Sequence, residues 1–186
     1  MRVISGKYRG ATLTSPHGEV RPTADIAKGS IFSILASRGL PSGAECLDVF
    51  CGSGALGIEA LSRGAQSCVF VDMNTKNADA NLKKLKIDAR LVCADFRRAL
   101  RMLKNTSYDI IFCDPPYKSG YAEPALGLML KYGLLKKDGL IIIEHSSSND
   151  LIIPPEVSII DRRVFGAAAL EFIKRGDNEG DNSGNV

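Results

Sequence analysis

The chain has 186 residues, of which 45% are hydrophobic and 24% charged, and its formal net charge is +3 at pH 7. These values fit one globular domain with at most a small appendage. No apolar run approaches the ~20 residues of a membrane span, and the N-terminus has no secretory apolar region, so we expect a cytoplasmic protein without membrane contact. Five cysteines form no CxxC pair, so neither a disulfide framework nor a metal site is expected.

The positive charge is concentrated at the start of the chain. Residues 1–40 hold six basic and two acidic side chains, whereas residues 41–186 hold 18 basic and 19 acidic ones. A basic arm on a nearly neutral body suits a phosphate backbone, although a solvated charged surface has a similar composition.

The first forty residues predict a hairpin and a helix. Residues 2–5 and 11–14 have the pattern of two short strands joined by a glycine-containing turn. A helix is expected to follow, with Thr23 as its N-cap and Gly39 at its end. A hairpin this short cannot form a core alone, so it should lie against the main sheet or a partner.

From there strands and helices alternate, which predicts a parallel sheet with helices on both faces. Two further strand-like runs without helical spacing between them predict an antiparallel hairpin at the sheet edge. The fold class is therefore α/β, with a seven-stranded, mostly parallel sheet. Strands are expected at 45–50, 67–72, 89–93, 110–113, 139–144, 157–161 and 169–174, and helices at 55–63, 74–86, 95–103 and 122–132. Residues 176–186 lack apolar periodicity and predict a disordered tail.

The buried strand at 110–113 runs directly into Asp114-Pro115-Pro116-Tyr117. Two prolines end the strand because their ring nitrogens cannot donate to a ladder. Asp114 and Pro115 should therefore lie at the carboxyl edge of the sheet, where open α/β folds bind ligands. The Asp114 carboxylate and the Pro115 carbonyl suit the two hydrogens of an amino group, and Tyr117 suits stacking on its ring. The alternative is an ordinary strand-to-loop turn, for which Asp-Pro is common.

Gly52, Gly54 and Gly57 form G-x-G-x-x-G between a strand and a helix, a spacing that lets a nucleotide approach the backbone. Nicotinamide and flavin enzymes share this spacing. Asp48, just before the turn, would repel a pyrophosphate but suits an ammonium group. Asp72 ends the next strand, where a carboxylate can bind ribose hydroxyls, and this feature fits NAD equally well.

Two further residues leave alternatives open. Asp95 suits an adenine amino group or the N-cap of the following helix, and both roles are compatible. Cys51 lies in the glycine loop, where packing against a ligand is favoured over nucleophilic chemistry because neither histidine is near in sequence.

These motifs resemble known ones. Asp114-Pro115-Pro116-Tyr117 resembles the Asp/Asn-Pro-Pro-Tyr/Phe motif of S-adenosylmethionine-dependent methyltransferases that act on amino nitrogens. Residues 48–54 resemble the first motif of class I methyltransferases. With residues 2–10, Arg21-Pro22-Thr23 and residues 50–64, the chain resembles the bacterial 16S rRNA guanine-N2 methyltransferase family (RsmD-type) over nearly its whole length. The family usually carries an Arg and a Glu at the positions of Ile26 and Gly29. This difference argues against this helix contributing polar groups to RNA or to the active site.

The resemblance implies a Rossmann-like class I methyltransferase domain at 41–175, preceded by an RNA-contacting extension at 1–40. It implies S-adenosylmethionine as cofactor, 16S rRNA or the small ribosomal subunit as partner, and a monomer. The expected catalytic residues are Asp114, Pro115, Pro116 and Tyr117, and the residues expected to contact RNA phosphates are Lys7, Arg9 and Arg21. The residues expected to bind the cofactor are Asp48, Phe50, Gly52, Ser53, Gly54, Asp72, Met73, Asp95 and Phe96.

Three alternatives to this function are considered. One is another amino-methyltransferase, acting on DNA adenine or on a protein glutamine; enzymes of the second kind usually have Asn where this chain has Asp114. The others are a nicotinamide-dependent dehydrogenase and a non-catalytic RNA-binding protein that kept the fold.

Overall fold

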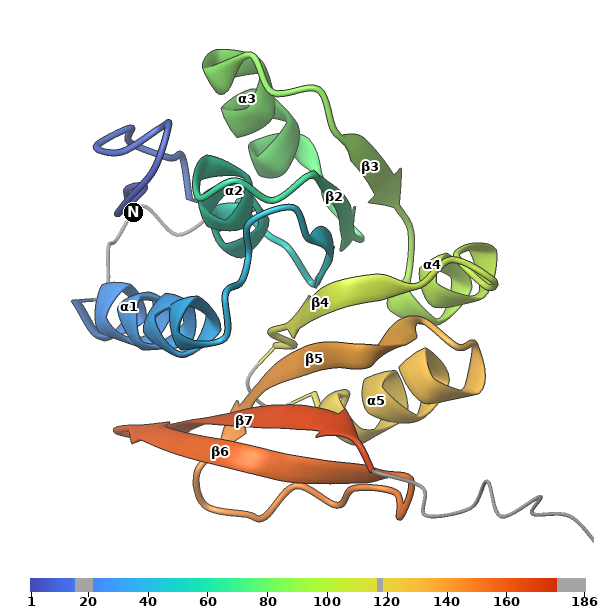
Figure 1. Ribbon diagram of the computed structural model, residues 1–186. Helices are drawn as coiled ribbons and strands as arrows, with labels where there is room; N and C mark the ends of the chain where they lie inside the picture. Colours follow the sequence, from blue (N-terminus) through green and yellow to red (C-terminus); the bar gives the residue numbers. More distant parts are fainter. Residues whose placement is uncertain (16–21, 117–118, 177–186) are drawn as a thin grey trace, which may run out of the picture.

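The computed structural model describes residues 1–15, 22–116 and 119–176. In these residues seven strands form one sheet in the order β3-β2-β1-β4-β5-β7-β6 (Figure 1). The strands are β1 (Glu45–Val49), β2 (Ser67–Asp72), β3 (Arg90–Cys93), β4 (Tyr108–Cys113), β5 (Leu135–Ser146), β6 (Val157–Phe165) and β7 (Ala168–Arg175). The helices are α1 (Pro22–Ser37), α2 (Ala55–Ser62), α3 (Lys76–Leu85), α4 (Phe96–Met102) and α5 (Ala122–Lys131).

Strands β1 to β5 pair in parallel, and β7 is antiparallel to both β5 and β6. The predicted mostly parallel sheet with an antiparallel edge hairpin is therefore confirmed. A parallel pair needs a helical crossover, and here α2, α3, α4 and α5 provide one after each of the first four strands.

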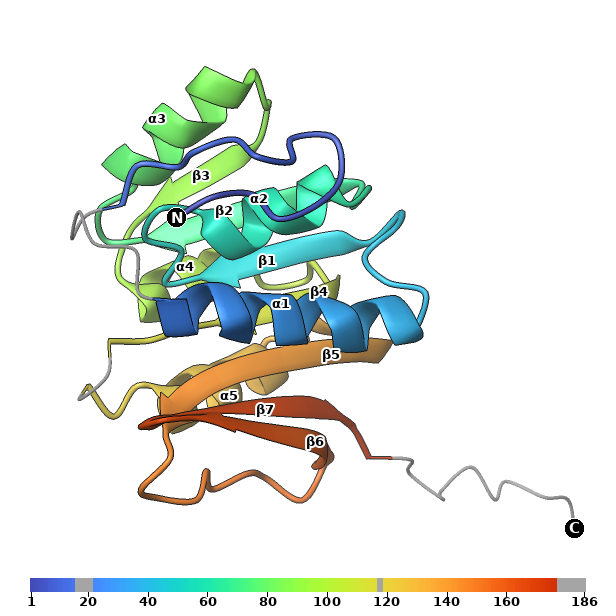
Figure 2. The same cartoon turned by 90° about the vertical axis from the view of Figure 1, so that its left-hand side faces the viewer.

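Both faces of the sheet are covered, because alternate residues of each central strand enter different cores. In β4, Ile110 and Phe112 pack with Phe32 of α1 and Ile58 of α2, on the face that Figure 2 shows in front. Ile111 and Cys113 pack on the other face with residues of α4 and α5. Burial on both faces explains why these strands are continuous apolar runs.

Several element boundaries differ from the predicted ones, and the starts of α1 and β5 are two of them. Helix α1 begins at Pro22, so Thr23 is not the N-cap; proline is well tolerated at the first helical position because its missing N–H has no helical partner there. Strand β5 begins at Leu135 and passes through Gly139, which was expected to start it. A Cβ at Gly139 would lie 3.0 Å from the Tyr108 carbonyl oxygen, beside a register irregularity between β4 and β5.

The N-terminal hairpin is present as paired segments with a single antiparallel bridge, between Arg2 and Thr12, rather than as two strands. The turn between the segments binds helix α2 instead of extending the pairing. The backbone N–H of Lys7 donates to the carbonyl of Ser62 at 2.7 Å. A Cβ at Gly6 would lie 1.8 Å from the same oxygen, so this close approach requires glycine. The hairpin was expected to lie against the main sheet or a partner, whereas in the structure its turn binds α2, a helix that covers the sheet.

A fully buried carboxylate fastens this segment to the body of the protein. Glu59 of α2 accepts the backbone N–H groups of Ile4 at 2.7 Å and Ser5 at 3.0 Å. Its charge is balanced by Arg63 at 2.8 Å and by Lys28 of α1 at 3.4 Å. Burial lowers the pKa of Lys28 despite the attraction of Glu59. One of the six basic residues near the N-terminus is thus internal and does not belong to a phosphate-binding surface.

The tail expected to be disordered lies, from residue 177 onward, outside the described residues. In the described part of the chain, no helix combines the length and apolar character needed to cross a membrane.

Candidate active site at the carboxyl edge of the sheet

The parallel register brings the two sequence motifs together. Val49, which precedes the glycine loop, lies beside Cys113, which precedes Asp114. The N–H of Asp114 donates to the Val49 carbonyl at 3.3 Å. The glycine loop and the Asp-Pro-Pro segment are therefore neighbours at the carboxyl edge, as predicted.

Each of the three glycines of the loop occupies its position for a different structural reason. Gly54 caps α2 with a positive φ of 76°, a conformation in which other residues are strained. Gly57 faces β2, and a Cβ there would lie 2.4 Å from the Phe70 ring. Gly52 has a φ of 51° and no protein atom within 4 Å of a Cβ position. Its backbone therefore borders open space, which is what close approach of a nucleotide requires.

Two carboxylates hold this loop in shape. The Asp48 carboxylate accepts the N–H of Gly57 at 2.9 Å, and Asp72 accepts the N–H groups of Gly52 and Asn74, both at 2.9 Å. Asp48 is only 2% exposed, and this burial raises its pKa to about 7, helped by the nearby charge of Asp72. Each carboxylate keeps acceptor capacity beyond these bonds, so the expected ammonium and ribose contacts stay predictions that the geometry permits.

The loop is also tied to the N-terminal segment through a residue that sequence reasoning missed. Asn81 of α3 is fully buried, and its amide donates to the carbonyls of Ser53 and Thr14, both at 2.9 Å. Its side-chain oxygen accepts the N–H of Thr14 at 2.8 Å. The one local signal was an asparagine on the apolar side of a predicted helix, between Ala78 and Leu82.

Aromatic rings line the edge beside the glycine loop. The ring centroid of Phe50 lies 5.0 Å from that of Phe96 and 6.3 Å from that of Tyr121. The guanidinium of Arg97 lies 4.3 Å from the Phe96 centroid and 5.1 Å from that of Tyr121. Phe50 itself has a φ of 63°, which is unusual outside glycine. Tyr121 and Arg97 were not predicted, because their place here depends on how α4 and α5 pack.

The remaining residues expected to bind the cofactor occupy varied environments. Met73 is 74% exposed, Phe96 is buried beneath Arg97, and the Ser53 side chain is buried in the loop. Asp95 caps α4, accepting the N–H of Arg97 at 2.9 Å, so the N-cap interpretation is confirmed. Adenine binding by Asp95 stays a prediction.

Asp114 and Pro115 occupy the predicted position at the end of β4, and Tyr117 lies outside the described residues. Asp114 is exposed to solvent, and the surrounding protein desolvates it only in part. This partial desolvation, together with the charges of Glu144 and Asp48, raises the pKa of Asp114 to about 8. The Asp114 carboxyl therefore ionises more readily when a ligand brings positive charge beside it.

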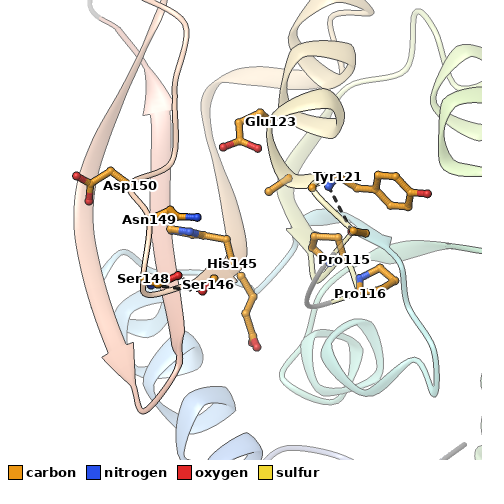
Figure 3. A pocket seen from close by; sticks show the side chains of 13 residues that line it. Pro115, Pro116, Tyr121, Glu123, His145, Ser146, Ser148, Asn149 and Asp150 are labelled. Atoms are coloured by element: carbon orange, nitrogen blue, oxygen red, sulfur yellow. Dashed lines mark hydrogen bonds between the residues drawn. The ribbon is translucent and has the colours of Figure 1, made fainter.

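A cleft of about 440 Å³ opens beside this segment, within the roughly 300–1,000 Å³ usual for ligand pockets. Pro115 and Pro116 lie on one side of it and Ser146 and Ser148 on the other, with Glu123 of α5 above (Figure 3). The side chain of His145 lies 3.2 Å from Glu171 of β7. The cleft was not predicted, because it forms between elements that are distant in sequence.

Two of the basic residues expected to contact RNA, Lys7 and Arg9, do not lie at this edge. Lys7 is held beside Ser62, the last residue of α2, whereas the glycine loop precedes its first residue. The eight residues of α2 span about 12 Å, which separates the backbone of Lys7 from the glycine loop by about that distance. Arg9 is exposed in the same turn, and Arg21 lies outside the described residues. Within the described ranges, no group of three or more His, Cys, Asp or Glu could hold a metal ion.

Comparison with known proteins agrees with this geometry. Residues 1–174 match the family described as Conserved hypothetical protein 95. Ribosomal RNA small subunit methyltransferase D of Escherichia coli K12 is 35% identical over 181 residues, covering 94% of this chain and 90% of that protein. The protein of the same name from Haemophilus influenzae is 33% identical, covering 92% of each chain.

Two solved structures have the same architecture. The Escherichia coli protein yhhF has a TM-score of 0.84 at 34% identity, covering 94% of this chain and 97% of that one. A hypothetical protein of Thermus thermophilus has a TM-score of 0.79 at 28% identity, covering 94% of this chain and 99% of that one. The chain therefore belongs to the Conserved hypothetical protein 95 family, the RsmD-type family of ribosomal RNA small subunit methyltransferases.

Proposed function

We propose that this protein transfers the methyl group of S-adenosylmethionine to the exocyclic N2 amine of a guanine in 16S ribosomal RNA. Family membership and the names of the relatives support methylation of ribosomal RNA. The choice of an amino nitrogen rests on one observation. Asp114 and Pro115 present a carboxylate and a carbonyl at the end of β4, directly beside the strand that leads into the glycine loop.

The residues around the loop fit S-adenosylmethionine, which supplies a methyl group made electrophilic by its sulfonium. Open space at Gly52 allows the ligand to approach the backbone, and Asp72 retains acceptor capacity for ribose hydroxyls. Three carboxylates, those of Asp48, Asp72 and Asp114, surround the loop. In their ionised form these groups attract a cationic ligand and repel the pyrophosphate of NAD, which argues against a nicotinamide-dependent dehydrogenase.

The catalytic role of the protein is then positioning. The lone pair of a guanine N2 amine is delocalised into the ring, which makes the amine a poor nucleophile. Acceptance of its two hydrogens by Asp114 and the Pro115 carbonyl favours a pyramidal nitrogen whose lone pair is free to attack. Holding the amine in line with the methyl group supplies much of the rate enhancement. The Asp114 carboxylate also stabilises the positive charge that develops on nitrogen. As the new C–N bond forms, the bond from methyl to sulfur breaks, so that S-adenosylhomocysteine is the other product, and the nitrogen then releases one proton to water.

The amine of a stacked base is out of reach, so the target guanine must leave its stack or lie in a single-stranded segment. Within this proposal, residues 1–40 form the RNA-contacting extension of a methyltransferase domain at 41–175, and Lys7, Arg9 and Arg21 contact phosphates. The protein acts as a monomer on 16S rRNA or the small subunit, which places it in the cytoplasm.

The test is to incubate the purified protein with labelled S-adenosylmethionine and small ribosomal subunits from cells that lack it, then to digest the RNA and identify the labelled nucleoside. We expect N2-methylguanosine at a single position of 16S rRNA. Parallel reactions with DNA and with ribosomal protein serve as controls. Label in adenine or only in protein would overturn the proposal, and no label in any acceptor would favour the non-catalytic alternative.

A further inference from the structure

The end of β5 places a second carboxylate beside Asp114. Cys113 of β4 and Ile143 of β5 are partners in the parallel register, and Asp114 and Glu144 each follow directly. Because side chains alternate along a strand, Asp114 continues the face of Phe112 and Glu144 continues that of Ile142, and these two residues pack in the same core. The two carboxylates therefore project from adjacent strand ends on the same side of the sheet.

Contacts support this placement. Glu144 lines the cleft beside Pro115, and its charge acts on Asp114 strongly enough to raise the pKa of that carboxyl. No hydrogen bond joins the Glu144 carboxylate to any residue in the described part of the chain. It is half-buried, in a position where an unpaired ionised group is costly. An acceptor held in this way is suited to a donor brought by a ligand.

We propose that Glu144 is a specificity-determining residue that accepts the N1–H of the target guanine, so that the enzyme methylates guanine and rejects bases without a donor at N1. This inference rests on the proposed function. The edge of guanine that carries N2 presents three hydrogens, one on N1 and two on N2. The strand ends present three matching acceptors, namely the carboxylates of Glu144 and Asp114 and the carbonyl of Pro115.

The same arrangement rejects other bases. Adenine and 2-aminopurine carry an acceptor at N1, which would face the Glu144 carboxylate with no hydrogen between them. A site built to bind an N–H discriminates strongly against an analogue that lacks it, because its own polar group is left unpaired. Asp114 and Pro115 alone would bind any exocyclic amine, so the choice among amines falls to Glu144.

The test compares guanine with 2-aminopurine, which keeps the N2 amine and lacks the N1 hydrogen. Small subunits are assembled on 16S rRNA carrying either base at the mapped target, and kcat/KM is measured for the wild type and for Glu144→Gln. We expect the wild type to prefer guanine by about 100-fold or more. In Glu144→Gln the amide can donate to N1 of 2-aminopurine, so the preference should fall by at least about tenfold.

Three further measurements make the outcome decisive. Glu144→Asp keeps the charge and should keep the preference for guanine even if turnover falls. Glu123→Gln removes a carboxylate that lines the same cleft from α5 and should leave the preference unchanged. Binding of S-adenosylmethionine shows whether each variant is folded. A Glu144→Gln protein with lower turnover and an unchanged preference would overturn the inference, whereas a wild type that makes no N2-methylguanosine would overturn the proposed function itself.

Discussion

At the ends of β1 and β2, the carboxylates of Asp48 and Asp72 accept backbone N–H groups of the glycine loop. At the ends of β4 and β5, no hydrogen bond within the described ranges reaches the carboxylates of Asp114 or Glu144. The carboxylates at the ends of β1 and β2 (the cofactor half) thus bind the protein's own backbone, whereas those at the ends of β4 and β5 (the acceptor half) do not within the described ranges. In the cofactor half the carboxylates hold the backbone of the glycine loop. In the acceptor half we propose that they bind the target base.

This difference explains where stability and activity should reside. The cofactor half is continuous with α2, with the N-terminal segment and with the buried Glu59 network. The acceptor half places like charges close together, which lowers stability in the absence of ligand. Substitutions in the first half should therefore reduce stability, and substitutions in the second should reduce activity at little cost in stability.

The largest expected effect is on stability. Replacing Glu59 with alanine removes the acceptor of two backbone N–H groups and leaves the buried Lys28 without its partner. The free energy of unfolding should fall by about 3–5 kcal/mol, measured by urea denaturation. Asp79→Ala, which breaks an exposed pair with Lys83 on α3, is the matched control and should change it by at most about 1 kcal/mol. Equal losses in the two variants would contradict the assigned role of the Glu59 network.

The next effect is on turnover. Asp114→Ala should lower kcat for methyl transfer by about 10²- to 10³-fold, because the developing charge on the amine loses its counter-charge. Stability should be unchanged or higher, since repulsion with Glu144 and Asp48 is relieved. Asp138→Ala, an exposed carboxylate elsewhere on β5, should leave kcat unchanged. If Asp114→Ala kept normal turnover, the Asp-Pro-Pro segment would not hold the reacting amine.

The sequence could predict features that depend on adjacent residues, and it could not predict features that depend on distant contacts. The positions of Asp48, Gly52 and Asp114 at the carboxyl edge could be predicted because they depend on a few adjacent residues and on the end of a strand. The alternation of strands and helices also predicted the sheet, whose pairings follow from burial on both faces.

Residues whose role depends on distant contacts were missed. Asn81 binds Thr14, which is 67 positions away in the sequence, and Tyr121 meets Phe50 only because α5 packs beside β4. Glu144 was treated as the end of a strand. The role that we propose for it depends on the order of the strands, which places β5 beside β4.

A third prediction separates backbone strain from ligand exclusion in the cofactor half. Gly52→Ala and Gly43→Ala both place a Cβ in open space at a positive φ, 51° and 72° respectively, so both should lose about 1–2 kcal/mol of stability. Only Gly52→Ala places the Cβ where the cofactor is expected, and it should weaken S-adenosylmethionine binding by about tenfold, measured by calorimetry. Equal affinities in the two variants would mean that the ligand does not approach Gly52.

The smallest expected effect on ligand binding is a pH dependence that links the two halves. The pKa of Asp48 is raised from 3.8 to about 7 and that of Asp114 to about 8, so near neutral pH the folded protein binds protons that the unfolded chain releases. The free energy of unfolding should therefore fall as pH rises from about 4 to 8.

A cationic ligand favours the ionised carboxylates, so the affinity for S-adenosylmethionine should rise with pH, in the direction opposite to stability. It should rise roughly fourfold between pH 6.5 and 8 if ionised Asp48 is required, with protons released on binding. Calorimetry in buffers of different ionisation enthalpy measures that release, and Asp48→Asn should reduce it. An affinity independent of pH would show that the buried carboxylate does not face the positive charge of the ligand, and the cofactor half would then owe its carboxylates to folding alone.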